Sequence, residues 1–332
     1  MLKKPGAALR ILLFSTIRRK ERPLASLIPP QLQYNDLIGI AAPAGPLDDK
    51  KQPAYKKGLA YLRAKGFRII EANNIHSACG YLAGSDTERA NELNRLIRNP
   101  QVKAIFCVRG GYGSARILDA IDYQALKIDP KIIVGYSDIT YLQLAIFTHT
   151  KVVTFSGPMV AADLGESLSA VSERSLWEMI MSPAFPALSP EADQIPLKIL
   201  QHGTARGVLL GGCLPMVASL VGTPYLPDMA DAILVLEDVG ESFFRMDRYL
   251  AQLKNSGILD RIAGLVLGQF VDYEQDDPQN RSLGFEDIIR HYTAHRPIPV
   301  VADFPYGHGK TKYTLPMGAT CTLDTEQKSL IF

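Results

Sequence analysis

Three short segments of the 332-residue sequence hold residue types from which a hydrolytic site can be built. The first is Arg-Gly-Gly-Tyr-Gly-Ser at 109–114, between an apolar run and a helical pattern. Its glycines permit a sharp turn with positive φ angles, which brings Ser114 to the start of a helix. There the helix dipole favours a developing negative charge, as in a nucleophile elbow. A plain helix cap at Ser114 and a phosphate cradle are the alternatives.

The second segment is an apolar run that ends in two acids. Glu237 and Asp238 follow residues 233–236, and Glu241 comes a little later. Carboxylates at the C-terminal edge of a parallel sheet point into the crevice where α/β proteins bind ligands, and an acid there can orient a histidine. On local sequence alone, a solvated turn or a helix cap is the simpler interpretation.

The third segment is Asp-Phe-Pro-Tyr-Gly-His-Gly at 303–309, in which His308 lies between two glycines. A histidine with an ordinary pKa of about 6.5 suits a general base. His291 and His295 have the i, i+4 spacing of a metal pair, but no acid or cysteine of metal-site spacing stands beside them. We therefore expect no metal centre and no other cofactor. The four cysteines are widely scattered, which favours a reducing compartment.

Two other residues that follow a strand are given a structural role. In Gly-Tyr-Ser-Asp-Ile-Thr at 135–140, either Ser137 or Asp138 is predicted to cap the helix that opens there.

The patterns along the chain alternate between strands and helices. Short apolar runs predict strands, and apolar residues with a period near 3.6 predict helices, one of them capped by Ser85 with Glu88. This alternation implies right-handed βαβ units and a mostly parallel sheet. The predicted strands are 37–41, 67–71, 102–108, 132–134, 207–210, 233–236, 262–267 and 300–302. The predicted helices are 51–65, 86–98, 115–120, 138–147, 214–220, 244–255 and 285–295.

The fold class is therefore α/β. Residues 31–182 are predicted to form a Rossmann-like or flavodoxin-like domain with a mostly parallel sheet. A linker is expected at 183–203, where four prolines break regular structure. Residues 204–332 are predicted to form a smaller α/β domain, which ends in a hairpin of 319–323 with 329–332. Because Ser114 precedes the linker and the acid and histidine follow it, the site should lie between the two domains.

Composition excludes several classes of protein. With 47% hydrophobic and 21% charged residues, the chain is neither disordered nor a small disulfide scaffold. A net charge of +2 gives no reason to expect a nucleic-acid partner. The basic residues concentrate near the start, so residues 1–30 are predicted to be a flexible basic extension. No run approaches the roughly 20 apolar residues of a membrane span, and the short run at 7–13 is unlike a secretory signal.

An ordered set of motifs resembles the LD-carboxypeptidase family, the muramoyltetrapeptide carboxypeptidases, with the microcin-immunity peptidases as relatives. The resemblance runs from about residue 37 to the C-terminus. The segments that carry it are 109–114, 135–140, Gly211-Gly212, 223–225, 236–238 and 304–309.

The resemblance implies a serine peptidase that cleaves an amide between an L-centre and a D-residue. The usual reaction releases D-alanine from a murein tetrapeptide during cell-wall recycling in the cytoplasm. Ser114 matches the nucleophile, Glu237 the triad acid and His308 the triad base. The resemblance also suggests a homodimer. Cys213 departs from it, because many relatives carry Asn after the glycine pair, and this puts local packing or a substrate contact in doubt.

Further roles within the site are assigned as candidates. The turns at Gly84, Gly113 and Ala115 are candidates for binding the oxyanion, and Tyr112 and Tyr306 are candidates for substrate contacts. Two other functions stay open. A related peptidase that cleaves a peptide–nucleotide conjugate would carry the same motifs, and a non-catalytic protein could use residues 110–113 to bind a phosphate or nucleotide.

Overall fold

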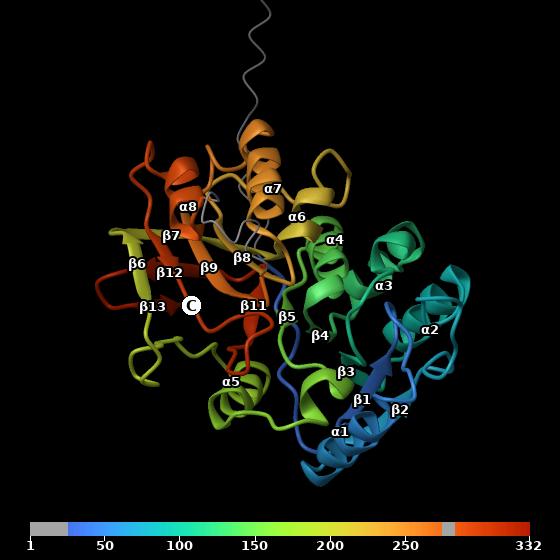
Figure 1. Cartoon of the computed structure of the whole chain (residues 1–332). Helices are drawn as coiled ribbons and strands as arrows, with labels where there is room; N and C mark the ends of the chain where they lie inside the picture. Colours follow the sequence, from blue (N-terminus) through green and yellow to red (C-terminus); the bar gives the residue numbers. More distant parts are fainter. Residues whose placement is uncertain (1–25, 274–282) are drawn as a thin grey trace, which may run out of the picture.

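The computed structural model describes residues 26–273 and 283–332, which form two β-sheets with helices around them. Figure 1 shows the first sheet in blue to green, except for its edge strand β11, which is red like the end of the second sheet. The first sheet has the strand order β11-β5-β4-β3-β1-β2, in which all neighbours but β11 and β5 are parallel. The order 2-1-3-4-5 is that of flavodoxin-like doubly wound folds, so the predicted fold class is confirmed. The parallel strands are β1 (Leu37–Ala41), β2 (Arg68–Glu71), β3 (Val102–Cys107), β4 (Ile132–Gly135) and β5 (Thr154–Ser156).

Helices pack around the strands of this sheet, which explains why β1 and β4 are buried along their whole length. The predicted capping box of α2 is confirmed, because Ser85 and Glu88 bond to each other's backbone amides. The helices are α1 (Gln52–Ala64), α2 (Asp86–Arg98), α3 (Tyr123–Ile128), α4 (Thr140–Thr150) and α5 (Ala170–Met181).

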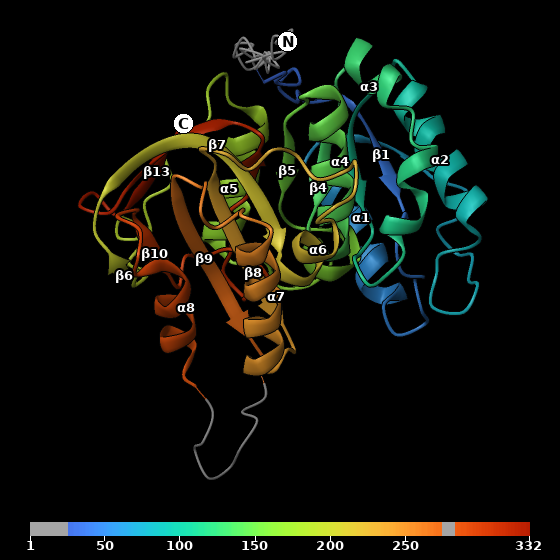
Figure 2. The same ribbon diagram turned by 90° about the horizontal axis from the view of Figure 1, so that it is seen from above.

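The second sheet has seven strands in the order β13-β12-β7-β8-β9-β10-β6, with β7 to β10 parallel. Helices α7 (Phe243–Asn255) and α8 (Phe285–Thr293) lie on the same face of it (Figure 2). The predicted terminal hairpin is confirmed as β12 and β13. The strands are β6 (Lys198–Gln201), β7 (Thr204–Cys213), β8 (Ile233–Val239), β9 (Gly264–Val271), β10 (Val300–Ala302), β12 (Thr320–Asp324) and β13 (Ser329–Ile331).

The division into domains is less simple than the predicted one. The predicted linker contains β6, which comes after the last of its prolines and pairs antiparallel with β10. Strand β11 (Leu315–Met317) follows the second sheet's strand β10 in sequence but pairs antiparallel with β5, at the edge of the first sheet. Its Pro316 is tolerated there because an edge strand leaves some amides unpaired. The first sheet therefore takes its edge strand β11 from the C-terminal part of the chain.

Most of the predicted basic extension lies outside the described residues. Its last part is paired with the body of the protein, because Leu27 exchanges backbone hydrogen bonds with Lys151 and Val153. Within residues 26–273 and 283–332, no helix is both long and apolar enough to cross a bilayer.

The sheets meet where β7 ends and α4 begins. The Cys213 amide donates to Thr140 Oγ1 over 3.1 Å. At Gly212, which has φ +136°, a Cβ would lie 2.5 Å from the same oxygen. Only glycine allows this close approach. Helix α6 (Leu214–Ser219) begins directly after Cys213.

Arg89 in α2 holds two loops at the carboxyl edge of the first sheet. Its side chain is fully buried, and Nη1 donates to the carbonyl oxygens of Pro43, over 2.5 Å, and of Gly113, over 2.8 Å. Nη2 is bonded to Asp86. One side chain thus fixes the loops that follow β1 and β3.

We predict that Arg89→Met lowers the free energy of unfolding by about 3 kcal/mol, because it removes the charged donor from the buried Pro43 carbonyl and one cationic partner from Asp86. Arg98→Met in the same helix is the matched control. Arg98 is 61% exposed and pairs with Asp122 at the surface, so its loss should cost about 1 kcal/mol or less. Urea unfolding measures both, and equal losses would contradict the role given to Arg89.

Candidate active site

Ser114 begins a short 3-10 helix, η1 (Ser114–Ala120), directly after the glycine turn that follows β3. The turn requires glycine, because Gly111 and Gly113 have φ angles of +112° and +128°. A Cβ on Gly113 would also lie 2.6 Å from Leu82 Cδ2. The predicted position of the serine, at a helix start behind a glycine turn, is confirmed.

The hydroxyl of Ser114 is buried and has no hydrogen-bond partner among the described residues. The Ser114 amide donates to Asp138 Oδ2 over 2.8 Å. Burial raises the pKa of Asp138, although this hydrogen bond favours the ionised form. The predicted helix-cap role of Asp138 is therefore wrong: its side chain reaches the turn that carries Ser114.

Glu237 and His308 form the central pair of the site. His308 Nδ1 donates to Glu237 Oε2 over 2.7 Å, with the histidine side chain 18% exposed and the glutamate side chain fully buried. Glu241, the alternative acid, instead pairs with Arg245 over 3.4 Å. Because the carboxylate holds Nδ1, the imidazole can use Nε2 to accept or donate a proton.

The segment after β4 connects the two halves of the site. The Tyr136 ring packs edge-on against His308, with ring centroids 5.0 Å apart. Two residues later, Asp138 binds the amide of Ser114. Ser114 and His308 thus both contact the segment that follows β4. No hydrogen bond joins the Ser114 hydroxyl to His308.

A cavity of about 560 Å³ opens beside His308. On one wall the Lys312 ammonium is bonded to Asp163 Oδ1 at 2.7 Å and to the Tyr136 hydroxyl at 3.0 Å. Burial, and then the Asp163 carboxylate, raise the pKa of Tyr136 well above its usual value, so the phenol stays protonated. Charged side chains that line this cavity are Asp163, Glu166, Lys310 and Lys312.

Two tyrosines were predicted to contact substrate. Tyr306 is 1% exposed and its hydroxyl is bonded to Ser156 over 2.8 Å, so its ring belongs to the core, which argues against direct contact. Tyr112 is 49% exposed and packs edge-on against Tyr81, with centroids 5.3 Å apart. The role predicted for Tyr112 stays a prediction, and Tyr81 is an exposed neighbour that sequence analysis did not single out.

The candidate oxyanion donors have different surroundings. The Gly84 amide already donates to the carbonyl of Leu82 over 2.9 Å. Gly113 precedes η1, and Ala115 lies in its first turn, where amides have no acceptor within the helix. The Gly84 amide is bonded to Leu82 and the Gly113 amide to Asp138, so the Ala115 amide is the candidate that the geometry favours.

A second buried acid lies beside the Glu237–His308 pair. Asp238 is 2% exposed, and its Oδ1 accepts from the Val239 amide at 2.8 Å and lies 3.8 Å from the Cys213 sulfur. Burial raises the pKa of Asp238 to about 7, and the Glu237 carboxylate adds to the shift. Burial, followed by the Glu237 carboxylate, also raises the pKa of Cys213 well above its usual value, so its thiol stays neutral.

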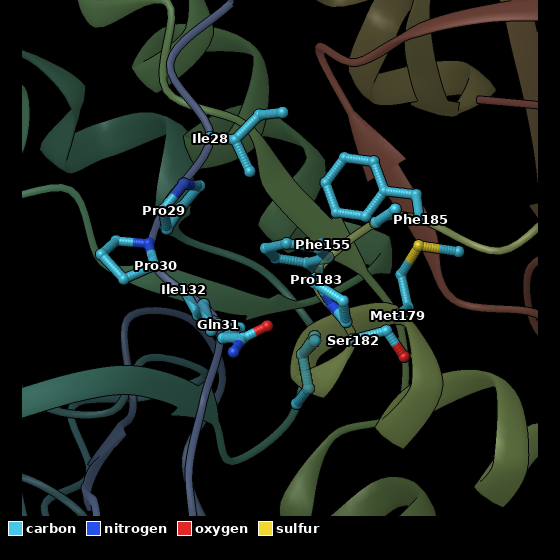
Figure 3. A pocket seen from close by; sticks show the side chains of 12 residues that line it. Ile28, Pro29, Pro30, Gln31, Ile132, Phe155, Met179, Ser182, Pro183 and Phe185 are labelled. Carbon is cyan, nitrogen blue, oxygen red and sulfur yellow. The ribbon is translucent and has the colours of Figure 1, made fainter.

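Another hollow, of about 300 Å³, is mostly apolar (Figure 3). Ile28, Pro30, Phe155 and Phe185 line it, and its described lining includes none of the predicted site residues. In the part of the chain that the structure describes, no group of three or more His, Cys, Asp or Glu side chains is placed to hold a metal ion.

A histidine bound to a buried carboxylate beside a cavity is typical of hydrolases. Comparison with known families agrees: the LD-carboxypeptidase N-terminal domain matches residues 38–157, and the LD-carboxypeptidase C-terminal domain matches residues 206–323. The chain belongs to the LD-carboxypeptidase family, as the resemblance predicts.

Three similar proteins cover nearly the whole chain. A probable murein peptide carboxypeptidase of Bacillus subtilis (strain 168) is 34% identical over 91% of this chain and 93% of its own. The crystal structure of a muramoyltetrapeptide carboxypeptidase from Oxalobacter formigenes has a TM-score of 0.77 at 31% identity, covering 89% and 97% of the two chains. The structure of MccF in complex with glutamyl sulfamoyl guanosine has a TM-score of 0.82 at 25% identity, covering 91% and 97%.

Gly307→Ala is predicted to displace the Glu237 carboxylate. The new Cβ would lie 2.4 Å from Glu237 Oε2, at a φ of +105° that is itself strained. We expect peptidase activity to fall about 100-fold, as for a misplaced catalytic group. Gly257→Ala is the matched control, with φ +76° and nothing within 4 Å of the new Cβ. Because both glycines have positive φ, each variant should lose roughly 1–2 kcal/mol of stability from backbone strain. Gly257→Ala should nevertheless keep its activity. Equal activities in the two variants would refute the clash with Glu237.

Asp238→Asn is predicted to change how stability depends on pH. The folded protein keeps the Asp238 proton up to about pH 7, whereas an unfolded chain loses it near about pH 4. Between these values the folded state binds more protons, so this carboxyl makes the wild type less stable as pH rises. Asparagine does not titrate. The unfolding free energy of the wild type minus that of the variant should therefore fall from pH 4 to 7, by at most roughly 4 kcal/mol.

Urea unfolding at several pH values between 4.5 and 7.5 measures this difference. Asp260→Asn is the control, because Asp260 is a surface residue whose pKa is lowered by its hydrogen bond to Lys254. If the difference between wild type and variant falls equally with pH for Asp238→Asn and Asp260→Asn, then Asp238 is not the source of the pH dependence.

Proposed function

We propose that the protein is a serine-type LD-carboxypeptidase that releases the terminal D-alanine from murein tetrapeptides. Ser114 is the nucleophile, His308 the base and Glu237 the acid that orients the base. The observation that carries the proposal is the 2.7 Å hydrogen bond between the buried Glu237 and His308, a residue that lines a cavity, in a chain of the LD-carboxypeptidase family.

The reaction begins when His308 Nε2 takes the Ser114 proton as Oγ attacks the scissile carbonyl. Glu237 keeps the Nδ1–H tautomer and stabilises the imidazolium that forms. Ser114 Oγ has no hydrogen-bond partner among the described residues, and catalytic hydrogen bonds often tighten only when substrate binds. The Ala115 amide is the preferred donor to the oxyanion, and one such donor contributes about 3 kcal/mol.

The second half of the reaction releases both products. The imidazolium gives its proton to the leaving nitrogen as the C–N bond breaks, so D-alanine departs and an acyl ester remains on Ser114. Water, deprotonated by His308, then attacks the ester and restores the serine. The cavity of about 560 Å³ is larger than an alanine residue needs, which suits a substrate that places more of its peptide there.

The cellular setting follows from the family rather than from the site. We propose that the protein acts in the cytoplasm, as a homodimer, on peptides returned during cell-wall recycling. The names of similar proteins, murein peptide carboxypeptidase and muramoyltetrapeptide carboxypeptidase, support the substrate class.

A second candidate is cleavage of a peptide-like bond to a nucleotide. It is favoured by the similarity to MccF, which was solved with glutamyl sulfamoyl guanosine. The third candidate is a protein that binds a phosphate or nucleotide with the glycine turn and has no catalytic activity. It requires that the ligand affinity survive removal of the Ser114 hydroxyl.

Ser114→Ala and His308→Ala are each predicted to lower kcat for D-alanine release by at least about 10³-fold, because triad members act as a unit. Mass spectrometry of a murein tetrapeptide, incubated with each variant, measures the release. Ser182→Ala and His295→Gln are matched controls that change the same residue types away from the cavity, and both should keep wild-type rates. His295 is half-exposed and bonded to Asp260.

The alternatives give different results in the same assay. Release of D-alanine by Ser114→Ala at the wild-type rate would remove Ser114 as the nucleophile. A wild type that leaves the tetrapeptide intact but cleaves an aminoacyl sulfamoyl nucleoside would favour the second candidate. Cleavage of neither, with nucleotide affinity unchanged by Ser114→Ala, would favour the third.

A further inference from the structure

A carboxypeptidase has to recognise the free carboxylate of the residue that it removes. Carboxylates are bound most strongly by charged donors such as lysine and arginine. Two lysines, Lys310 and Lys312, line the cavity beside His308. They differ in what already surrounds their ammonium groups.

Lys312 is already paired inside the protein. It is 5% exposed, its ammonium is bonded to Asp163 and Tyr136, and it lies 4.3 Å from the centre of the Tyr136 ring. Drawing it away toward a ligand would leave the buried Asp163 carboxylate without its cation, which costs several kcal/mol. Lys312 therefore stabilises the wall of the cavity and is not available to bind the substrate.

Lys310 is in the opposite situation. It lies at the exposed rim of the same cavity, and its ammonium makes no ion pair or hydrogen bond to the described residues. Of the acids in the lining, Asp163 is neutralised by Lys312, and Glu166 is exposed, where water and salt screen its charge. Lys310 is thus a cation with room for an anionic partner.

The position of Lys310 in the chain matches the geometry of the reaction. It is two residues from His308, so the two Cα atoms are at most about 7 Å apart. In the proposed mechanism His308 protonates the leaving nitrogen, and the carboxylate carbon of the leaving residue is only about 2.5 Å from that nitrogen. A substrate bound for cleavage therefore holds its terminal carboxylate within reach of a long side chain at position 310.

We propose that Lys310 binds the C-terminal carboxylate of the substrate and thereby restricts cleavage to the terminal residue. This inference rests on the proposed function, because it takes His308 as the proton donor to the leaving group. Lys310 is a specificity-determining residue, whereas Lys312 supports the wall behind it.

The test pairs a change in the enzyme with a change in the substrate. The two substrates are a murein tetrapeptide with a free terminal carboxylate and the same peptide with a terminal carboxamide. We expect wild-type kcat/KM to be about 10- to 100-fold higher for the acid. Lys310→Met should lower kcat/KM for the acid by about that factor and leave the amide almost unchanged. Lys310→Arg, which keeps the charge, should retain most of the preference.

Lys328→Met is the matched control, because Lys328 is a lysine of the terminal hairpin that pairs with Glu191. It should leave both substrates unaffected, and thermal unfolding should show that all three variants fold.

Two results would overturn the inference while the proposed function stands. One is a wild type that cleaves acid and amide equally well. The other is a Lys310→Met variant that keeps the preference, or loses activity equally toward both substrates. Cleavage of neither substrate by the wild type would overturn the proposed function and this inference with it.

Discussion

The hydrogen bond between His308 and the buried Glu237 is the constraint around which the second sheet is built. A carboxylate removed from water is costly unless charged or polar groups satisfy it, and here the imidazole is its partner. The surrounding backbone fits tightly: a Cβ on Gly268 or Gly307 would lie 3.0 Å or less from Glu237 side-chain atoms. Glycine at these two positions is therefore part of how the sequence specifies the site. The hydrogen bond to this carboxylate engages Nδ1, so Nε2 is the ring nitrogen that can exchange a proton with a ligand.

Two further acids of the site, Asp138 and Asp238, are buried. Burial raises the pKa values of both, that of Asp238 to about 7, so near neutral pH Asp238 carries a proton for part of the time. Negative charge then concentrates on Glu237, where it stabilises an imidazolium. Fixed charges and dipoles matter most in a site closed to water. A second anion beside Glu237 would oppose both an oxyanion and a substrate carboxylate, so the burial of Asp238 favours the proposed chemistry.

Local signals allowed most of the fold to be predicted from sequence. Apolar runs identified β1 and β8, and the Ser85–Glu88 pair identified the start of α2, because each depends on neighbours in the chain. Strands β6 and β11 were missed, since each has four residues or fewer and depends on a partner far away in sequence. Helices α3 and α5 were missed as well. The resemblance predicted a link between Glu237 and His308, which the structure bears out as a hydrogen bond.

Other features of the site carried no local signal. Asp138 opens a helix in the sequence and so was interpreted as a cap, yet its carboxylate binds the amide of a residue 24 positions earlier. The burial of Tyr306 depends on Ser156, 150 positions away. Both are consequences of tertiary packing.

The segment that carries His308 also joins the two sheets. It leaves β10 in the second sheet and reaches β11, which pairs with β5 in the first. On the way, the amides of Lys312 and Thr314 donate to the hydroxyls of Ser172 and Ser175 in α5. His308 is thus held from the second sheet through Glu237, and its segment is held from the first through α5 and β11. A shift between the sheets would move His308 relative to Ser114, so the pairing of β11 with β5 limits how far the two halves of the site can separate.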